Sequence, residues 1–148
     1  MIVRHLEPAF QDQRGQITDI IEHTPFDSVT IITCVRGADR GNHYHKESIQ
    51  YTYVLSGRIR ARTQSPDGPV EVADLAAGDL LESPPFVRHA LFALEDAVLL
   101  IMTRGPRGGK GYEEDTFRVS PLQPDIVPNQ KYSMDHVYDR YRQFTHSG

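Results

Sequence analysis

The sequence of 148 residues predicts a single all-β domain. Short segments of alternating or β-branched residues follow one another from residue 2 to residue 119, and polar or glycine-containing turns separate them. Helical periodicity is almost absent from this part of the chain. Such a series of short strands is typical of a β-sandwich or a β-barrel. We therefore expect one barrel over residues 1–120, followed by a C-terminal arm over residues 121–148.

The N-terminal third of the chain contains three strand candidates. Residues 2–6 are the first, and a polar turn with Asp12 and Gly15 leads into the second, residues 16–22. Residues 29–35 are apolar at both odd and even positions, which predicts a strand buried on both faces. Cys34, the only cysteine of the chain, lies within this segment, and we expect a small buried hydrophobe there rather than a nucleophile.

The middle of the chain continues the series. Residues 50–55 alternate and end at Gly57, which suits a tight turn. Residues 58–63 alternate arginines with apolar or small residues, which predicts a strand with one basic and one apolar face. Residues 69–75, 80–83, 89–94 and 98–103 complete the predicted strands.

The chain changes character after the last of these strands. Residues 104–111 contain four glycines and three cations, which predicts a loop without regular structure. This loop would gate the barrel mouth or hold an anionic ligand through Arg104, Arg107 and Lys110, or it is a solvated connection.

The C-terminal arm is expected to end in a helix. Residues 121–129 contain three prolines and predict an extended segment. Residues 133–144 carry apolar and aromatic side chains three and four positions apart, which predicts a short amphipathic helix with Ser133 as its N-cap. We expect its aromatic stripe to pack against the barrel or a second subunit.

Two histidines stand at the centre of the predicted barrel. His43 and His45 are two positions apart, so on an extended strand their imidazoles share one face. The spacing is Gly37, five residues, His43-x-His45, four residues, Gln50, six residues and Gly57.

A second motif follows, with the spacing Gly78, five residues, Pro84, one residue, Phe86, two residues and His89. The two motifs together cover about a third of the chain and resemble the two signatures of the cupin superfamily. This resemblance implies a double-stranded β-helix, also called a jelly-roll barrel.

The resemblance also implies that Gln50 and His89 join His43 and His45 inside the barrel. The chain departs from the superfamily pattern at three positions. Gln50 stands where glutamate is commonest, Phe86 where glycine is usual and Ala93 where asparagine is usual.

Four such residues would form a site of imidazole nitrogens and an amide oxygen. These ligands suit one divalent transition ion, namely Zn, Ni, Fe, Co or Mn, rather than Ca or Mg. The alternative is a hydrogen-bonded cluster without a metal, in which His43 and His45 serve as acid and base.

The heptad Arg40-Gly-Asn-His-Tyr-His-Lys46 carries a narrower resemblance. It is similar to cupins of nucleotide-sugar metabolism, including the metal-binding C-terminal domain of a capsular polysaccharide reductase. The pattern His-x-His-Lys-x-x-x-Gln also resembles the dTDP-4-keto-6-deoxyglucose 3,4-ketoisomerases, which work without a metal and shuttle protons with the paired histidines. An element similar to Asp12-x-Arg14-Gly15 often opens the domain in this branch of the cupins.

This narrower resemblance implies a sugar-nucleotide isomerase or epimerase in polysaccharide or deoxysugar biosynthesis. His43 and His45 would lie at the reacting carbons. Tyr53 or Tyr112 would be the acid partner, and Arg60, if its face points inward, would meet a pyrophosphate. The substrate-binding set would also include Arg40 and Lys46. The alternatives are a metal-dependent dioxygenase or lyase acting on a small molecule, and a cupin that binds a ligand without catalysis.

Charge and hydropathy restrict the partners. A formal charge of -4 argues against a general nucleic-acid binder. No apolar run could span a bilayer, and the N-terminus does not resemble a signal peptide, so we expect a cytoplasmic protein. We also expect a homodimer, because the apolar N-terminal strand and the aromatic tail need cover.

Overall fold

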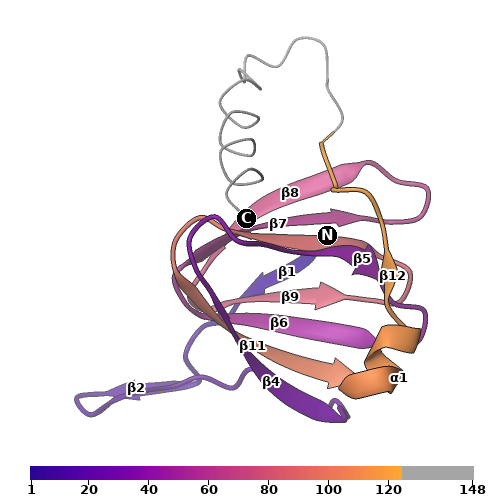
Figure 1. Cartoon of the computed structure of the whole chain (residues 1–148). Coiled ribbons are helices and arrows are strands. Elements are labelled where there is room, and N and C mark those ends of the chain that lie inside the picture. Colours follow the sequence, from indigo (N-terminus) through magenta and orange to yellow (C-terminus); the bar gives the residue numbers. More distant parts are fainter. Residues whose placement is uncertain (125–148) are drawn as a thin grey trace, which may run out of the picture.

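The computed structural model describes residues 1–124 of the chain. Two five-stranded antiparallel sheets face each other and enclose the core (Figure 1). The first sheet has the order β1 (Ile2–His5), β9 (Asp79–Ser83), β6 (Ile49–Ser56), β11 (Ala97–Arg104) and β4 (Ser28–Cys34). The second has the order β12 (Phe117–Arg118), β5 (Asp39–Tyr44), β10 (Arg88–Ala93), β7 (Arg58–Gln64) and β8 (Val70–Ala76). The predicted all-β barrel is thus confirmed.

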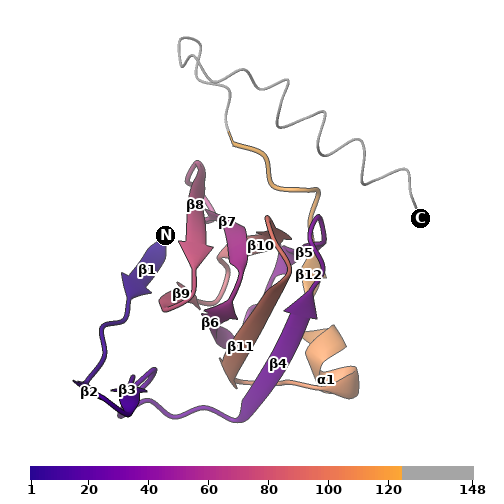
Figure 2. The same cartoon turned by 90° about the vertical axis from the view of Figure 1, so that its left-hand side faces the viewer.

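The core lies between the inner faces of the two sheets, which Figure 2 shows from the side. Val54 on β6, Leu99 on β11 and Ile59 on β7 are fully buried in it. The alternation predicted for residues 58–63 is confirmed, because Ile59 and Ala61 face this core while Arg60 lies on the opposite face. Burial of alternate side chains therefore fixes which residues can line the barrel interior.

A second apolar cluster covers the outer face of the first sheet. Leu6, Ile20 and Ile21 pack there against buried side chains of β6, β9 and β11. The predicted strand over residues 16–22 is shorter in the structure, because only β3 (Gly15–Ile17) pairs, with β2 (Phe10–Asp12). This β2–β3 hairpin projects from the barrel in Figure 1.

One expectation about burial is wrong. The segment around β4 was expected to be buried on both faces, but Val29 is 56% exposed and Ile31 is 65% exposed. The reason is the position of β4 at the edge of the first sheet, where no described element covers its outer face. Cys34 faces inward, and with 5% exposure it is the small buried hydrophobe that was predicted.

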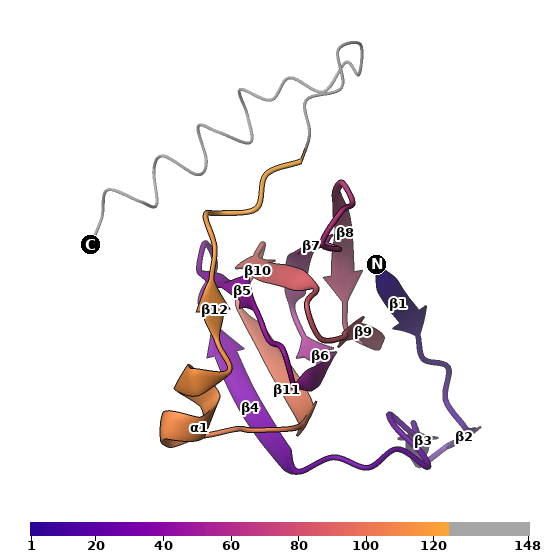
Figure 3. The same ribbon diagram turned by 90° about the vertical axis from the view of Figure 1, so that its right-hand side faces the viewer.

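The glycine-rich segment is also more ordered than expected. It contains a short helix, α1 (Gly109–Glu114), which leads into β12 at one end of the barrel (Figure 3). Gly108 and Gly109 adopt positive φ angles of 86° and 54°, which lets the chain turn sharply into this helix. No helix among residues 1–124 is long and apolar enough to cross a membrane. The helix predicted over residues 133–144 lies outside the described residues.

Candidate functional site

Three histidines come together on the second sheet. His43 on β5 and His89 on β10 are directly opposite each other in the strand register, and their ring centroids are 4.8 Å apart. His45 follows the end of β5, and its ring centroid lies 4.9 Å from that of His43 and 5.4 Å from that of His89. One ligand atom from each ring lies within 4.8 Å of the other two. We call these three residues the histidine cluster.

Hydrogen bonds orient two of the rings. Nδ1 of His45 lies 2.7 Å from the backbone oxygen of Asp115, and Nδ1 of His89 lies 3.2 Å from that of Val87. A carbonyl oxygen only accepts hydrogen bonds, so each Nδ1 carries the proton and each Nε2 of a neutral ring keeps its lone pair. Metal-binding histidines in proteins are commonly held in this way.

Within residues 1–124, three nitrogens of the cluster have no hydrogen-bond partner. They are Nδ1 of His43, Nε2 of His45 and Nε2 of His89, and all three are buried. Buried polar atoms in native proteins are nearly always satisfied, so these nitrogens indicate a site for a metal ion, a substrate or both.

Burial keeps the rings of His43 and His89 neutral. It lowers the pKa of His43 to about 3, with help from His89, His45 and the cations Arg118 and Arg107. It also lowers the pKa of His89 to about 4, against a smaller opposing effect of the Val87 hydrogen bond. Neutral imidazoles are the form that binds metals, so at neutral pH both rings are ready to act as ligands.

Asp115, which follows α1, was not predicted. Its carboxylate accepts hydrogen bonds from the backbone N–H groups of Lys46, Glu47 and Ser48 and from the Ser48 hydroxyl. Burial alone would raise the pKa of Asp115, but these hydrogen bonds outweigh it and hold the pKa below its usual value. Sequence reasoning missed this residue because its partners lie 67 to 70 positions away.

Gln50 lies on the other sheet and faces the interior. On β6 it shares the inward parity of Val54, and its neighbours in the register are Ser83 on β9 and Thr103 on β11. Its side chain is buried. The structure therefore places an uncharged amide on the sheet that faces the histidine cluster, and the ligation predicted for it stays a prediction.

Tyr112 is the predicted tyrosine that reaches the cluster. Helix α1 places its ring centroid 5.7 Å from that of His45 and 6.5 Å from that of His43. The guanidinium of Arg107 lies 4.7 Å from the centre of the Tyr112 ring. The glycine-rich segment thus brings one phenol and one cation to the site.

Tyr53 and Arg60 do not reach the histidine cluster. Tyr53 packs in the cluster on the outer face of the first sheet, because it has the opposite parity to Gln50. Arg60 lies on the outer face of the second sheet, where it makes a two-point ion pair with Asp74. Both side chains lie on outer faces of the sheets. The predictions that Tyr53 is the acid and that Arg60 contacts a pyrophosphate inside the barrel are therefore corrected.

Arg40 and Lys46 flank the motif but point away from the cluster. Arg40 donates a hydrogen bond to the backbone oxygen of Thr33, near the end of the barrel opposite to Gln50. The ammonium of Lys46 lies 4.3 Å from the centre of the Phe117 ring. Neither side chain has a contact with the three histidines among the described residues.

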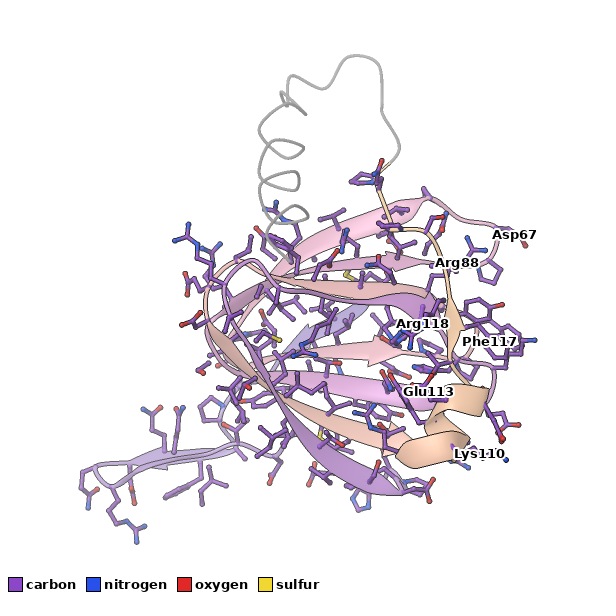
Figure 4. All side chains as sticks on the ribbon, viewed as in Figure 1. Asp67, Arg88, Lys110, Glu113, Phe117 and Arg118 are labelled. Atoms are coloured by element: carbon purple, nitrogen blue, oxygen red, sulfur yellow. The ribbon has the colours of Figure 1, made fainter. Side chains whose placement is uncertain are left out.

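Arg118 is a second functional candidate that the sequence did not indicate. It is the partner of His43 in the pairing of β12 with β5, so the two side chains project to the same face. Figure 4 shows Arg118 and Arg88 at the same end of the barrel as Phe117. The register of a two-residue strand has no sequence signal, which is why this cation was missed.

Known structures share this fold. A sugar 3,4-ketoisomerase from Thermoanaerobacterium thermosaccharolyticum, solved with TDP, is 26% identical, with a TM-score of 0.67 over 80% of this chain and 86% of that chain. A dTDP-4-dehydrorhamnose 3,5-epimerase from Sulfolobus tokodaii is 22% identical, with a TM-score of 0.64 over 78% of this chain and 73% of that one. The TDP-fucose 3,4-ketoisomerase of Campylobacter jejuni is 11% identical, with a TM-score of 0.66 over 78% and 87% of the two chains. These likenesses confirm the cupin-type jelly-roll barrel.

The family of the chain follows from a match over most of the barrel. No curated protein matches the sequence significantly. Residues 10–104, more than half of the chain, match the model of the polysaccharide biosynthesis C-terminal domain. That range includes both histidine motifs. The chain therefore belongs to the polysaccharide biosynthesis C-terminal domain family.

Proposed function

We propose that this protein is a sugar-nucleotide isomerase or epimerase of polysaccharide or deoxysugar biosynthesis. The observation that carries the proposal is the histidine cluster, with three buried nitrogens that have no partner within the barrel. The likeness to a ketoisomerase solved with TDP supports the same reaction class. A nucleotide sugar is accordingly the proposed substrate.

The proposed reaction moves a proton next to a keto group. A base removes the proton from the neighbouring carbon, and an acid returns a proton to an adjacent oxygen or carbon, so the atoms balance without a co-reactant. Nε2 of His45 would act as the base. The backbone oxygen of Asp115 accepts a hydrogen bond from Nδ1–H of the same ring, so the proton of the neutral ring is on Nδ1 and Nε2 is free to accept one. The Tyr112 hydroxyl would be the acid. His43 and His89, whose pKa values lie near 3 and 4, are weak bases.

A divalent transition ion also fits the cluster. The unpartnered nitrogens of His43, His45 and His89 would hold it, with the Gln50 amide as a further ligand. Such an ion, Zn, Ni, Fe, Co or Mn, would act as a Lewis acid on the keto oxygen. His45 would then be a ligand, and Tyr112 would remain as the residue that carries the proton.

A second function is favoured by the low pKa values of His43 and His89. Rings that stay neutral well below pH 7 are better suited to hold a metal than to exchange protons. The second candidate is therefore a metal-dependent dioxygenase or lyase that acts on a small molecule. The third candidate is a barrel that binds a sugar ligand without catalysis.

The deciding experiment measures proton exchange. The protein is incubated in D2O with dTDP-4-keto-6-deoxyglucose, and proton NMR follows the signals of the carbons next to the keto group. An isomerase or epimerase should replace these protons with deuterium and form a new sugar, and His45→Asn should abolish both. Binding of the nucleotide sugar without proton exchange would support a barrel that only binds a ligand. If the protein neither binds nor exchanges the nucleotide sugar but takes up oxygen in the presence of iron, the metal-dependent dioxygenase is supported instead.

A further inference from the structure

An exposed phenylalanine occupies a backbone position that bulky residues avoid. Phe86 has a φ angle of 66°, and the N–H of Val87 donates to the carbonyl of Pro84 at 3.3 Å. Pro84–Val87 is thus a four-residue turn with Pro85 second and Phe86 third. Turns of this kind need a positive φ at the third residue, which glycine or asparagine normally supplies. A strained residue that persists on the surface indicates a functional reason for its side chain.

The ring of Phe86 ends a column of aromatic rings. It stacks on Tyr44, with centroids 6.4 Å apart and planes at 26°, and Tyr44 stacks on Phe117 at 5.3 Å and 21°. Lys46 closes the far end of the column over the Phe117 ring. Phe86 itself is 49% exposed. Among the described residues, the column is therefore capped by a cation at one end and uncovered at the other.

The column lies beside the histidine cluster. The N–H of Phe86 donates to the backbone oxygen of His45 at 2.6 Å. Tyr44 stands between His43 and His45 in the chain, so its ring takes the opposite face of the strand. The column and the histidine cluster therefore lie on opposite faces of the chain at the end of β5. We call this end of the barrel wall the rim.

Cations stand along this rim. Phe117 and Arg118 are consecutive on β12, so Phe117 faces the aromatic column and Arg118 faces the side of His43. Arg88, two residues after Phe86, lies at the same end of the barrel (Figure 4). Arg118 pairs with the exposed Glu113 at 3.5 Å, and Arg88 donates to the side-chain oxygen of Gln64 at 3.2 Å. A diphosphate that crossed the rim would compete with Glu113 for Arg118.

We propose that Phe86 is a stacking platform for the base of a nucleoside diphosphate sugar, a role that rests on the proposed function. The base lies on the open face of the Phe86 ring and extends the column. The diphosphate crosses the rim past Arg118, and the sugar reaches the histidine cluster. This arrangement explains why a strained turn keeps an exposed aromatic ring, because any base offers a face for stacking.

The test compares thymidine diphosphate with inorganic pyrophosphate as ligands in isothermal titration calorimetry. Phe86→Leu keeps an apolar side chain but loses the aromatic face, so it should weaken binding of thymidine diphosphate about tenfold. Binding of pyrophosphate should stay unchanged. Phe86→Tyr should bind as the wild type does. Phe26→Leu, at another exposed phenylalanine, is the matched control and should change neither affinity.

Phe86→Gly adds a readout of the strain. Glycine takes the positive φ without cost, so this variant should unfold at the same or a higher temperature and still bind thymidine diphosphate weakly. Equal affinity of the wild type and Phe86→Leu for thymidine diphosphate would overturn the platform and leave the proposed function intact. Failure of the wild type to bind thymidine diphosphate or uridine diphosphate would overturn both.

Discussion

The backbone oxygen of Asp115 lies 2.7 Å from Nδ1 of His45. This contact joins the end of α1 to the histidine cluster, and the Asp115 carboxylate strengthens the connection by binding three successive N–H groups of residues 46–48. One residue therefore fixes the orientation of the His45 ring and the path of the chain between β5 and β6. The same residue anchors the helix that carries Tyr112.

Removal of the Asp115 carboxylate should loosen the site and destabilise the fold. Asp115→Ala removes the acceptor of the buried Ser48 N–H and of the part-buried N–H groups of Lys46 and Glu47, which should cost about 2–3 kcal/mol in free energy of unfolding. Asp115→Asn keeps one acceptor oxygen and should cost less. Urea denaturation followed by circular dichroism measures both. Asp12→Ala, at an exposed ion pair, is the control and should cost under about 1 kcal/mol. Equal stability of wild type and Asp115→Ala would contradict the anchoring role.

The metal content should depend on the cluster. Purified protein should carry a divalent transition ion, and His89→Ala should lose it because one of the three imidazoles is removed. Gln50→Glu should tighten binding by adding a negative charge opposite the ion. Elemental analysis and competition with a chelator measure both effects. Less than about a tenth of an ion per chain, with full activity of His89→Ala, would instead leave the acid–base cluster as the site.

Stability should fall in mild acid. An unfolded histidine has a pKa of about 6.5, whereas His43 and His89 have pKa values of about 3 and about 4 in the folded chain. Below about pH 6.5 the unfolded state therefore binds protons that the folded state does not, so the free energy of unfolding decreases as the pH falls. The slope should approach about 1.4 kcal/mol per pH unit for each ring.

Urea denaturation in a chelator at several pH values measures this slope. His89→Gln cannot titrate and should reduce it, whereas substitution of His23, an exposed residue outside the cluster, should not. A free energy of unfolding that stays constant from neutral pH down to about pH 5 would contradict the burial of neutral rings.

Tyr112 should matter for catalysis and Tyr53 should not. Tyr112→Phe removes the proposed acid but keeps the ring, whose centroid lies 5.7 Å from that of His45. It should lower kcat about a hundredfold with little change in substrate affinity. Tyr53→Phe changes a residue on the outer face of the sheet and should keep kcat. The NMR exchange assay measures both variants. A larger loss in Tyr53→Phe than in Tyr112→Phe would contradict the placement of the acid.

The exposed face of β4 should be an interface between two copies of the chain. Val29, Ile31 and Val35 form an apolar surface at the edge of the first sheet, and such surfaces are commonly covered by a partner. Light scattering should give about twice the mass of one chain. Ile31→Lys should shift the protein towards the monomer, while Val72→Lys, on the edge strand β8, should not. A monomeric wild type at micromolar concentration would contradict the dimer.

The sequence by itself predicted the all-β fold and most of its strands. Alternation of apolar and polar residues and the positions of glycine and proline are local properties, so they could be read without a structure. The same alternation placed His43 and His45 on one face, and the resemblance to the second cupin signature implied His89 as the third imidazole. The structure brings all three rings together.

Only the tertiary structure decided which other residues reach the cluster. Strand parity placed Tyr53 and Arg60 on outer faces, although both looked equally available in the sequence. Asp115 and Arg118 reach the site through a hydrogen bond and a strand register that span about half the chain. Local sequence patterns hold no information about such long-range pairing, because it is set by how the two sheets close around a common core.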